Sequence, residues 1–128
     1  MTAAILVCED DPIHRELIRA SLARGPYTIY EIEDGRHLVE AAKSTRPDLV
    51  MLDLRMPEAD GIELLAALRS DPEVGDVPVL VLTGAVRQTD RDAADRAGAD
   101  LFLAKPFSPR ELARTVDSLV ASPRADAA

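Results

Sequence analysis

The sequence alternates strand-like and helix-like segments five times, and this repetition limits the chain to few folds. Four strand-like segments are short apolar runs, and the segment Tyr27–Ile32 has the alternating pattern of an edge strand. The helix-like segments carry apolar residues at helical spacing. The predicted strands are Ala4–Cys8, Tyr27–Ile32, Leu49–Leu52, Val79–Leu82 and Leu101–Ala104. Five such units predict an α/β domain with a doubly wound, five-stranded parallel sheet and five helices on both faces. The strand order 2-1-3-4-5 is the natural candidate.

Capping and turn residues predict where the helices begin and end. The helices are expected over Pro12 to about Ala23, Arg36–Ser44, from Gly61, over about Gln88–Ala97, and from Pro109. Asp11, Asp60 and Ser108 precede three of these starts, and side chains of these types cap helix N-termini. The first helix is predicted to turn Ile13 and Leu17 inward. The helix ending before Gly98 has only alanines on its predicted inner side, so we expect its packing to be the weakest.

Two of the runs, Leu49–Leu52 and Val79–Leu82, are apolar at every position, which is typical of strands buried on both faces. Asp53 follows the first run directly, so it is predicted to lie at the carboxyl end of a central strand. Open α/β sheets place their ligands at that end. The strand tips carry Glu9, Asp10 and Asp11 after the first strand, Asp53 after the third, Thr83 after the fourth and Lys105 after the fifth. In the predicted order these four strands are neighbours, and their tips converge.

Such a convergence of carboxylates requires compensation, because two like charges about 4 Å apart repel by roughly 4 kcal/mol at an effective dielectric constant of 20. Mg²⁺ fits this site, since it prefers a few carboxylates together with water and phosphate oxygens. Lys105 is one of two lysines, the other being Lys43, in a chain with 13 arginines. A compact ammonium beside Asp53 suits a single contact to one oxygen. The arrangement favours attack of a carboxylate on phosphorus, giving an aspartyl phosphate.

Charge and composition exclude other classes of protein. The formal net charge of −8 argues against general binding to nucleic acids or anionic membranes. The single cysteine, Cys8, excludes an internal disulfide and a multi-cysteine metal site, and it is expected to act as a small buried hydrophobe. His14 and His37 are interpreted as solvated helix residues. With no apolar stretch near 18 residues and no signal-like N-terminus, we expect a cytoplasmic protein.

Six motifs, in order and at matching spacing, resemble the receiver domain of response regulators, the phosphoacceptor of two-component signalling. They are Ile5–Asp10, Leu52–Pro57, Asp60–Gly61, Val81–Gly84, Gly98–Asp100 and Lys105–Phe107. The resemblance covers about residues 3–121. It implies a flavodoxin-like fold and places the receiver domain at residues 1–122. Residues 123–128 are expected to form a frayed tail or the start of a linker.

The resemblance also implies roles for single residues. Asp53 would be the phosphoacceptor, and Asp10, Asp53 and the backbone carbonyl of Arg55 would bind Mg²⁺ directly. Glu9 would act through metal-bound water, and Thr83 and Lys105 would bind phosphoryl oxygens. The Lys105–Pro106 peptide bond would be cis. Thr83 and Phe102 would form the switch that reshapes the surface of the fourth helix, fifth strand and fifth helix.

Some positions depart from the commonest family pattern. Glu9 stands where Asp is frequent, which lengthens the arm by one methylene. Phe102 stands where Tyr is frequent, which removes a hydroxyl. Arg55 and Ala85 occupy positions that tune the lifetime of the phosphoryl group, and we hypothesise that Arg55 shields it from water. For Asp11, helix capping is favoured over metal contact.

The expected partner is a sensor histidine kinase or a histidine phosphotransfer protein, followed by an unknown downstream protein and with a phosphorylation-dependent dimer as one option. The chain is expected to catalyse only its own phosphorylation and dephosphorylation, so it is not an enzyme in the usual sense. One alternative is an Mg²⁺-dependent phosphohydrolase with an aspartyl nucleophile. Those enzymes commonly carry a second acid two residues after the nucleophile, where this chain has Arg55. The other alternative is a pseudo-receiver that only binds partners.

Overall fold

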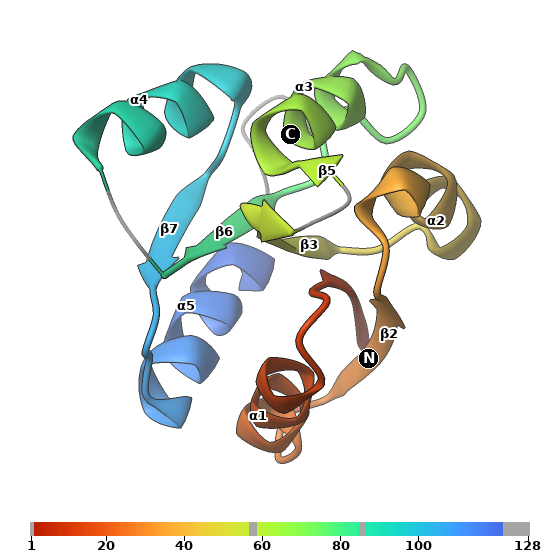
Figure 1. The fold of residues 1–128 in the computed structure, drawn as a ribbon. Helices are drawn as coiled ribbons and strands as arrows, with labels where there is room; N and C mark the ends of the chain where they lie inside the picture. The colour runs from red at the N-terminus through yellow and green to blue at the C-terminus, as the bar shows by residue number, and fades with distance from the viewer. Residues whose placement is uncertain (1, 57–58, 85–86, 122–128) are drawn as a thin grey trace.

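A sheet of five parallel strands lies at the centre of the computed structural model, which describes residues 2–56, 59–84 and 87–121 (Figure 1). In spatial order the strands are β2 (Tyr27–Ile32), β1 (Ala3–Cys8), β3 (Leu49–Asp53), β6 (Val79–Thr83) and β7 (Leu101–Ala104). This is the predicted order 2-1-3-4-5, and every neighbouring pair is parallel. The predicted doubly wound sheet is therefore confirmed.

Helices cover both faces of the sheet. Figure 1 shows α1 (Pro12–Leu22) and α5 (Pro109–Ala121) on one side, with α2 (Leu38–Thr45), α3 (Gly61–Ser70) and α4 (Gln88–Ala97) on the other. The sequence predicted one helix over Arg36–Ser44, but a short 3-10 segment, Gly35–His37, precedes α2. Within the described ranges, none of the helices combines the length and apolar character that a membrane crossing requires.

Alternating residues of the central strands pack into two separate cores, because successive side chains of a strand point to opposite faces of the sheet. Leu49 and Met51 of β3 pack with α1 and α5, and Val50 and Leu52 pack with the helices of the other face. All four side chains are fully buried. This double burial explains why every position of the run is apolar.

The predicted caps are present, but one helix face was predicted wrongly. Asp11 accepts a hydrogen bond from the backbone N–H of Ile13, and Ser108 and Glu111 cap the start of α5 reciprocally. Ile13 was expected on the inner side of α1, yet 74% of it is exposed. The buried stripe is centred on Ile18 and Leu22, and a residue five positions before Ile18 lies on another side of a helix with 3.6 residues per turn.

A short antiparallel pair follows β3 and was not predicted. Strands β4 (Arg55–Met56) and β5 (Ala59–Asp60) pair two residues each. Strands this short carry no recognisable periodicity, so no sequence pattern predicts them. Pro57 and Ala85, which the sequence analysis named, lie outside the described residues, as does the predicted tail at 123–128.

Candidate functional site

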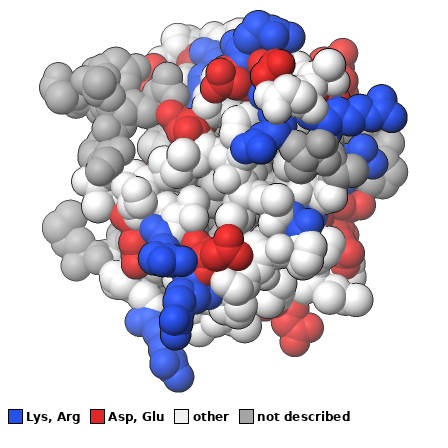
Figure 2. All heavy atoms as spheres, turned by 90° about the vertical axis from the view of Figure 1, so that its left-hand side faces the viewer, with Lys and Arg blue, Asp and Glu red and all other residues white. Residues whose placement is uncertain are grey.

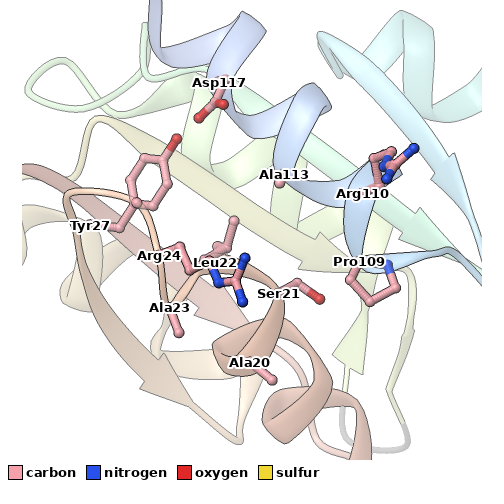
Figure 3. Close-up of a pocket in the computed structure, with 11 residues that line it drawn as sticks. Ala20, Ser21, Leu22, Ala23, Arg24, Tyr27, Pro109, Arg110, Ala113 and Asp117 are labelled. Carbon is pink, nitrogen blue, oxygen red and sulfur yellow. The ribbon is translucent and has the colours of Figure 1, made fainter.

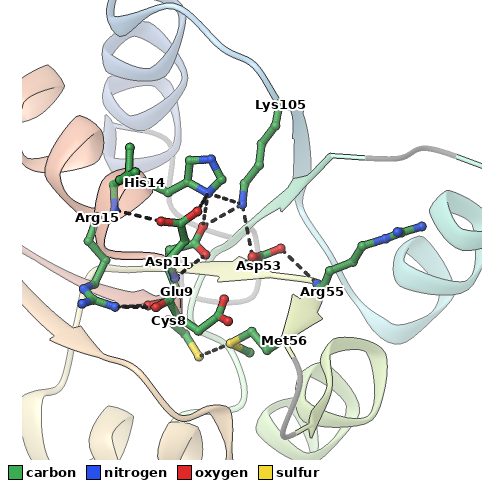
Figure 4. A network of polar contacts seen from close by, with 11 residues as sticks. Cys8, Glu9, Asp11, His14, Arg15, Asp53, Arg55, Met56 and Lys105 are labelled. Atoms are coloured by element: carbon green, nitrogen blue, oxygen red, sulfur yellow. Dashed lines mark hydrogen bonds and ion pairs between the residues drawn. The ribbon is translucent and has the colours of Figure 1, made fainter.

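Three strand ends bring acids and a lysine together at the carboxyl edge of the sheet (Figure 4). The Lys105 Nζ lies 2.7 Å from Glu9 Oε1 and 3.1 Å from Asp53 Oδ2. Glu9 directly follows β1, Asp53 ends β3 and Lys105 directly follows β7. The Lys105–Pro106 peptide bond is cis, as the resemblance implied. The predicted convergence of these tips is present in the structure.

The pleat of the strands decides which tips meet. Side chains two positions apart on a strand point to the same face. Asp53 lies two positions after Met51, and Lys105 lies two positions after Leu103, so both point to the face covered by α1 and α5. Thr83 lies two positions after Val81, which packs in the core of the opposite face, so Thr83 points to that face. By this alternation, Thr83 and Phe102 share one face of the sheet, and Asp53 and Lys105 share the other.

The site forms a hollow of about 270 Å³ that is open to solvent. We call it the acidic hollow; its lining residues are Glu9, Asp10, Asp11, His14, Asp53, Arg55, Gly84 and Lys105. Thr83 lines a neighbouring hollow of about 220 Å³ together with Leu54, Arg55, Asp60, Ile62 and Asp90. Arg55 is the residue common to both. The structure thus brings six of the predicted groups together or adjacent, and it places Phe102 farther along the face that holds Thr83.

Burial makes the charges of the acidic hollow interact strongly. Glu9 is fully buried and Asp53 is 4% exposed. The pKa of Glu9 is raised to about 7, mainly by burial and also by the nearby Asp53 carboxylate, while the Lys105 ammonium opposes the rise. Two buried acids thus share a single ammonium contact, so the hollow favours the arrival of more positive charge.

The acids of the hollow fit a hard divalent cation. Glu9, Asp10 and Asp53 each offer one carboxylate oxygen, and these three oxygens lie within 4.8 Å of one another. Oxygen donors of this kind suit Mg²⁺, which takes one or two carboxylates and fills its other positions with water or phosphate oxygens. The donor set therefore matches the predicted metal.

Backbone contacts fix the acids in place. The Arg55 N–H donates to Asp53 Oδ1 over 3.0 Å, and the Asp11 N–H donates to Glu9 Oε2 over 3.2 Å. The Arg15 guanidinium donates to the backbone carbonyls of Glu9 and Asp10 over 2.9 and 3.0 Å. Arg15 was not among the predicted site residues. A sequence signal was available, because Arg15 lies in the helix that directly follows the acids at the end of the first strand.

His14 was also missed, because it was interpreted as a solvated helix residue. Its Nδ1 lies 3.1 Å from Lys105 Nζ, and Figure 4 shows the ring turned toward the ammonium. The available signal was the position of His14 in the first turn of a helix that starts directly after an acidic strand tip. A side chain in that turn lies close enough to the strand tips to reach the site at the carboxyl edge of the sheet.

Cys8 is the last residue of β1 and packs in the core on the opposite face of the sheet from the α1 and α5 side. Its Sγ lies 3.8 Å from Met56 Sδ, and the residue is fully buried. Burial raises the pKa of the Cys8 thiol to about 12, with the charges of Asp53 and Glu9 adding to the rise. The thiol is therefore neutral, and the predicted role as a small buried hydrophobe is confirmed.

A larger groove of about 610 Å³ lies away from these groups, between the end of α1, the segment leading to β2, and α5 (Figure 3). Arg24, Tyr27, Arg110 and Asp117 line it together with small and apolar residues. It contains one carboxylate and no cluster of acids, so it offers none of the chemistry of the acidic hollow.

Comparison with known proteins agrees with this geometry. The sequence profile of the response regulator receiver domain matches residues 5–117. Response regulator MprA of Mycolicibacterium vanbaalenii is 41% identical over 120 residues, which are 94% of this chain and 51% of that protein. MprA of Mycobacterium tuberculosis is 38% identical over the same shares. The chain thus spans about half the length of these relatives.

Solved receiver domains have the same fold. One belongs to a sensor histidine kinase of Pseudomonas aeruginosa and holds a magnesium ion coordinated in its active-site cleft. It is 32% identical, with a TM-score of 0.86 over 95% of this chain and 100% of that one. Another, from a signal transduction histidine kinase of Syntrophus aciditrophicus, is 34% identical, with a TM-score of 0.84 over 93% and 90% of the two chains. The chain described here belongs to the response regulator receiver domain family.

Proposed function

We propose that this receiver domain accepts a phosphoryl group on Asp53 and uses it to change its surface. The observation that carries the proposal is the contact of Lys105 Nζ with Asp53 Oδ2 over 3.1 Å, inside a hollow with two further acids. Receiver domains are generally signalling modules, so the chain acts on its own phosphorylation and on no separate substrate. The phosphohydrolase alternative has no support from Arg55, which stands where a second acid would be needed.

The donor is a phosphohistidine of a sensor histidine kinase or a histidine phosphotransfer protein, or a small phosphodonor. An oxygen of Asp53 forms the new P–O bond. With a phosphohistidine donor the P–N bond breaks, and the leaving imidazole keeps the electron pair and takes up a proton. With acetyl phosphate the P–O bond to the acetyl group breaks, and acetate leaves with the electron pair. Lys105 holds an oxygen of the transferred group and offsets its charge.

Mg²⁺ bound by this site would offset the negative charge that gathers on the phosphoryl oxygens. Asp10, Asp53 and the backbone carbonyl of Arg55 would hold it, and Glu9 would act through its water. An increase in thermal unfolding temperature on adding Mg²⁺ tests this assignment. We expect the increase in the unmodified chain and its loss in Asp10→Ala, because a ligand stabilises only a protein that binds it.

Phosphorylation is tested directly with acetyl phosphate and Mg²⁺. We expect the intact mass to increase by one phosphoryl group, with an adduct that is stable in acid and lost in base. Asp53→Asn should abolish the adduct, and Asp11→Asn should keep it, because Asn also caps helices. Absence of the adduct would favour the pseudo-receiver alternative, and turnover of many phosphomonoesters would favour the hydrolase.

The switch is assigned to Thr83 and Phe102, which lie on the same face of the sheet. The phosphoryl group adds a charge of about −2, and the Thr83 hydroxyl moves toward its oxygens from the neighbouring hollow. Phe102 then fills the space that Thr83 leaves. The register of the strands supports this coupling, since Val81 lies opposite Phe102 and Thr83 lies opposite Ala104.

The surface that changes comprises α4, β7 and α5. Figure 2 views the molecule from this side and shows acidic and basic side chains interspersed around an uncharged central area. Leu101 of β7 is 40% exposed. We assign the downstream partner, or a second copy bound after phosphorylation, to this surface. The molar mass in solution before and after phosphorylation distinguishes the two. Neither nucleic acid nor membrane is expected as a direct partner, and the cytoplasm is the expected location.

Arg55 is assigned to the lifetime of the phosphoryl group. Its side chain is exposed, and the residue lines both hollows at the rim of the site. We expect Arg55→Ala to lose its phosphoryl group faster, because water reaches the phosphorus more easily. An unchanged dephosphorylation rate would contradict the shielding role.

A further inference from the structure

The Lys105 ammonium has one acceptor for each of its three N–H groups. An ammonium carries three donors and no acceptor. Its Nζ lies 2.7 Å from Glu9 Oε1, 3.1 Å from Asp53 Oδ2 and 3.1 Å from His14 Nδ1. The first two partners are buried carboxylates. The third is an imidazole whose side chain is 36% exposed.

The distances assign His14 the role of acceptor. Its Nδ1 lies 3.6 Å from Glu9 Oε1 and 3.4 Å from Asp11 Oδ2, both longer than an ordinary N–H···O hydrogen bond of about 2.7–3.2 Å. Among these three contacts within the described part of the chain, the one to Lys105 falls within hydrogen-bonding distance, and Lys105 cannot accept. The lone pair of Nδ1 therefore points at the ammonium, and the ring hydrogen resides on Nε2.

We propose that His14 is a positioning residue that holds the third N–H of Lys105 until a phosphoryl oxygen replaces it. This inference rests on the proposed phosphorylation of Asp53. An incoming oxygen needs an N–H of Lys105, and all three are engaged. His14 is the partner that leaves, because its side chain is 36% exposed, whereas Glu9 is fully buried and Asp53 carries the phosphoryl group itself. The phosphoryl oxygen that replaces it is charged, and hydrogen bonds to charged acceptors are the stronger ones.

The composition of the chain allows a direct test by ¹⁵N NMR of side chains. There are two lysines and two histidines. Lys43, at 45% side-chain exposure, and His37, at 65%, lie outside the hollow and serve as internal references. The exchange of ammonium protons with water reports the hydrogen bonding of Lys105. The long-range spectrum of the imidazoles reports which nitrogen carries hydrogen.

Three variants separate positioning from general structure. His14→Ala removes the acceptor, and His14→Asn restores one, because the Asn Oδ1 extends as far from the backbone as Nδ1. His37→Ala is the matched control. We expect proton exchange at Lys105 to rise about 2- to 10-fold in His14→Ala, the loss of one ordinary hydrogen bond. Exchange in His14→Asn and His37→Ala should stay near that of the unmodified chain, and Lys43 should not change. Equal urea midpoints verify that each variant is folded.

The replacement step is tested with Mg²⁺ and beryllium fluoride, which mimics a phosphoryl group on a carboxylate. In the free protein, the ¹⁵N chemical shift of His14 Nδ1 should show that this nitrogen accepts a hydrogen bond. We expect the shift to move to the value of an imidazole nitrogen without that hydrogen bond when the mimic binds, and to stay unchanged in Asp53→Asn. The proposal fails if Nδ1 carries hydrogen in the free protein, if His14→Ala leaves exchange at Lys105 unchanged, or if the ring stays in place when the mimic binds. Failure of the proposed phosphorylation shows differently, as absence of an acetyl phosphate adduct while the free-protein spectra still assign His14 as acceptor.

Discussion

The two helices on either side of β7 are held in opposite ways. Helix α5 buries Leu112, Val116 and Leu119, whereas Ala94 is the one buried residue in α4. The acidic hollow lies over the core that α5 completes. Helix α4 belongs to the side of the sheet with Thr83 and Phe102. The acidic hollow therefore lies on the firmly packed side of the sheet, and α4, with fewer buried contacts, should open locally at a lower free-energy cost than α5.

Helix α4 is also held unequally at its two ends. Its C-terminal end is tied down because the Arg69 guanidinium of α3 donates to the Gly98 carbonyl and to Asp100. Its first turn has no capping side chain among the described residues, since Arg87 occupies the cap position. The loose end is the one that follows β6 and Thr83. A movement of Thr83 would therefore reach the end of α4 that is easiest to displace.

The comparison is tested most strongly by removing apolar contacts from each helix. Leu112→Ala should lower the free energy of unfolding by about 2–5 kcal/mol, because it opens a cavity in a filled core. Ala94→Gly should cost only about 1 kcal/mol, mostly through helix propensity. Urea denaturation of both variants measures the difference. Equal losses would contradict the unequal packing of the two helices.

Removal of the polar tie is expected to have the next largest effect. Arg69→Ala should destabilise the protein by about 2–3 kcal/mol, because it removes the guanidinium that donates to Asp100 and to the backbone carbonyls of Gly75 and Gly98. Arg69→Lys should recover little, since a compact ammonium cannot reach acceptors in several segments at once. Hydrogen exchange of the α4 amides should rise in both variants. An unaltered urea midpoint in Arg69→Ala would show that α4 is anchored in another way.

The burial of Glu9 on the firmly packed side should make the free energy of unfolding depend on pH. Glu9 binds a proton more tightly when folded, because its pKa rises from 4.5 to about 7. The stability that this proton contributes is complete below pH 4.5 and is lost as the pH rises through 7. In metal-free buffer, unfolding free energy should fall across this window by about 1–3 kcal/mol more in the unmodified chain than in Glu9→Gln. Parallel pH profiles for the two proteins would contradict the burial of this acid.

The smallest effect is expected at the contact between α4 and the switch residue. The Arg91 guanidinium carbon lies 5.2 Å from the centroid of the Phe102 ring. Its loss in Arg91→Ala should cost about 0.5–1 kcal/mol, as for an exposed cation–π pair. A double-mutant cycle with Phe102→Leu isolates this energy. The same variant should broaden the ring signals of Phe102. A zero coupling energy would remove Arg91 from the responsive side.

The sequence alone determined the layered fold and the residues at its active edge. The run Leu49–Leu52 predicted a strand buried on both faces, and Asp53 at its end was therefore predicted to lie at the carboxyl edge. That prediction needed no contact information, because periodicity and chain direction are local properties. The cap at Asp11 was predictable for the same reason.

Only the tertiary structure decided which side chains meet across that edge. The pleat places Asp53 with Lys105 and turns Thr83 toward a second hollow. The roles of His14 and Arg15 also depend on where α1 lies over the strand tips. Ile13 shows the limit of local reasoning, because its exposure depends on which side of α1 meets α5 and the sheet. Contacts between segments that are distant in sequence follow from packing, and packing leaves no periodic signal in any one segment.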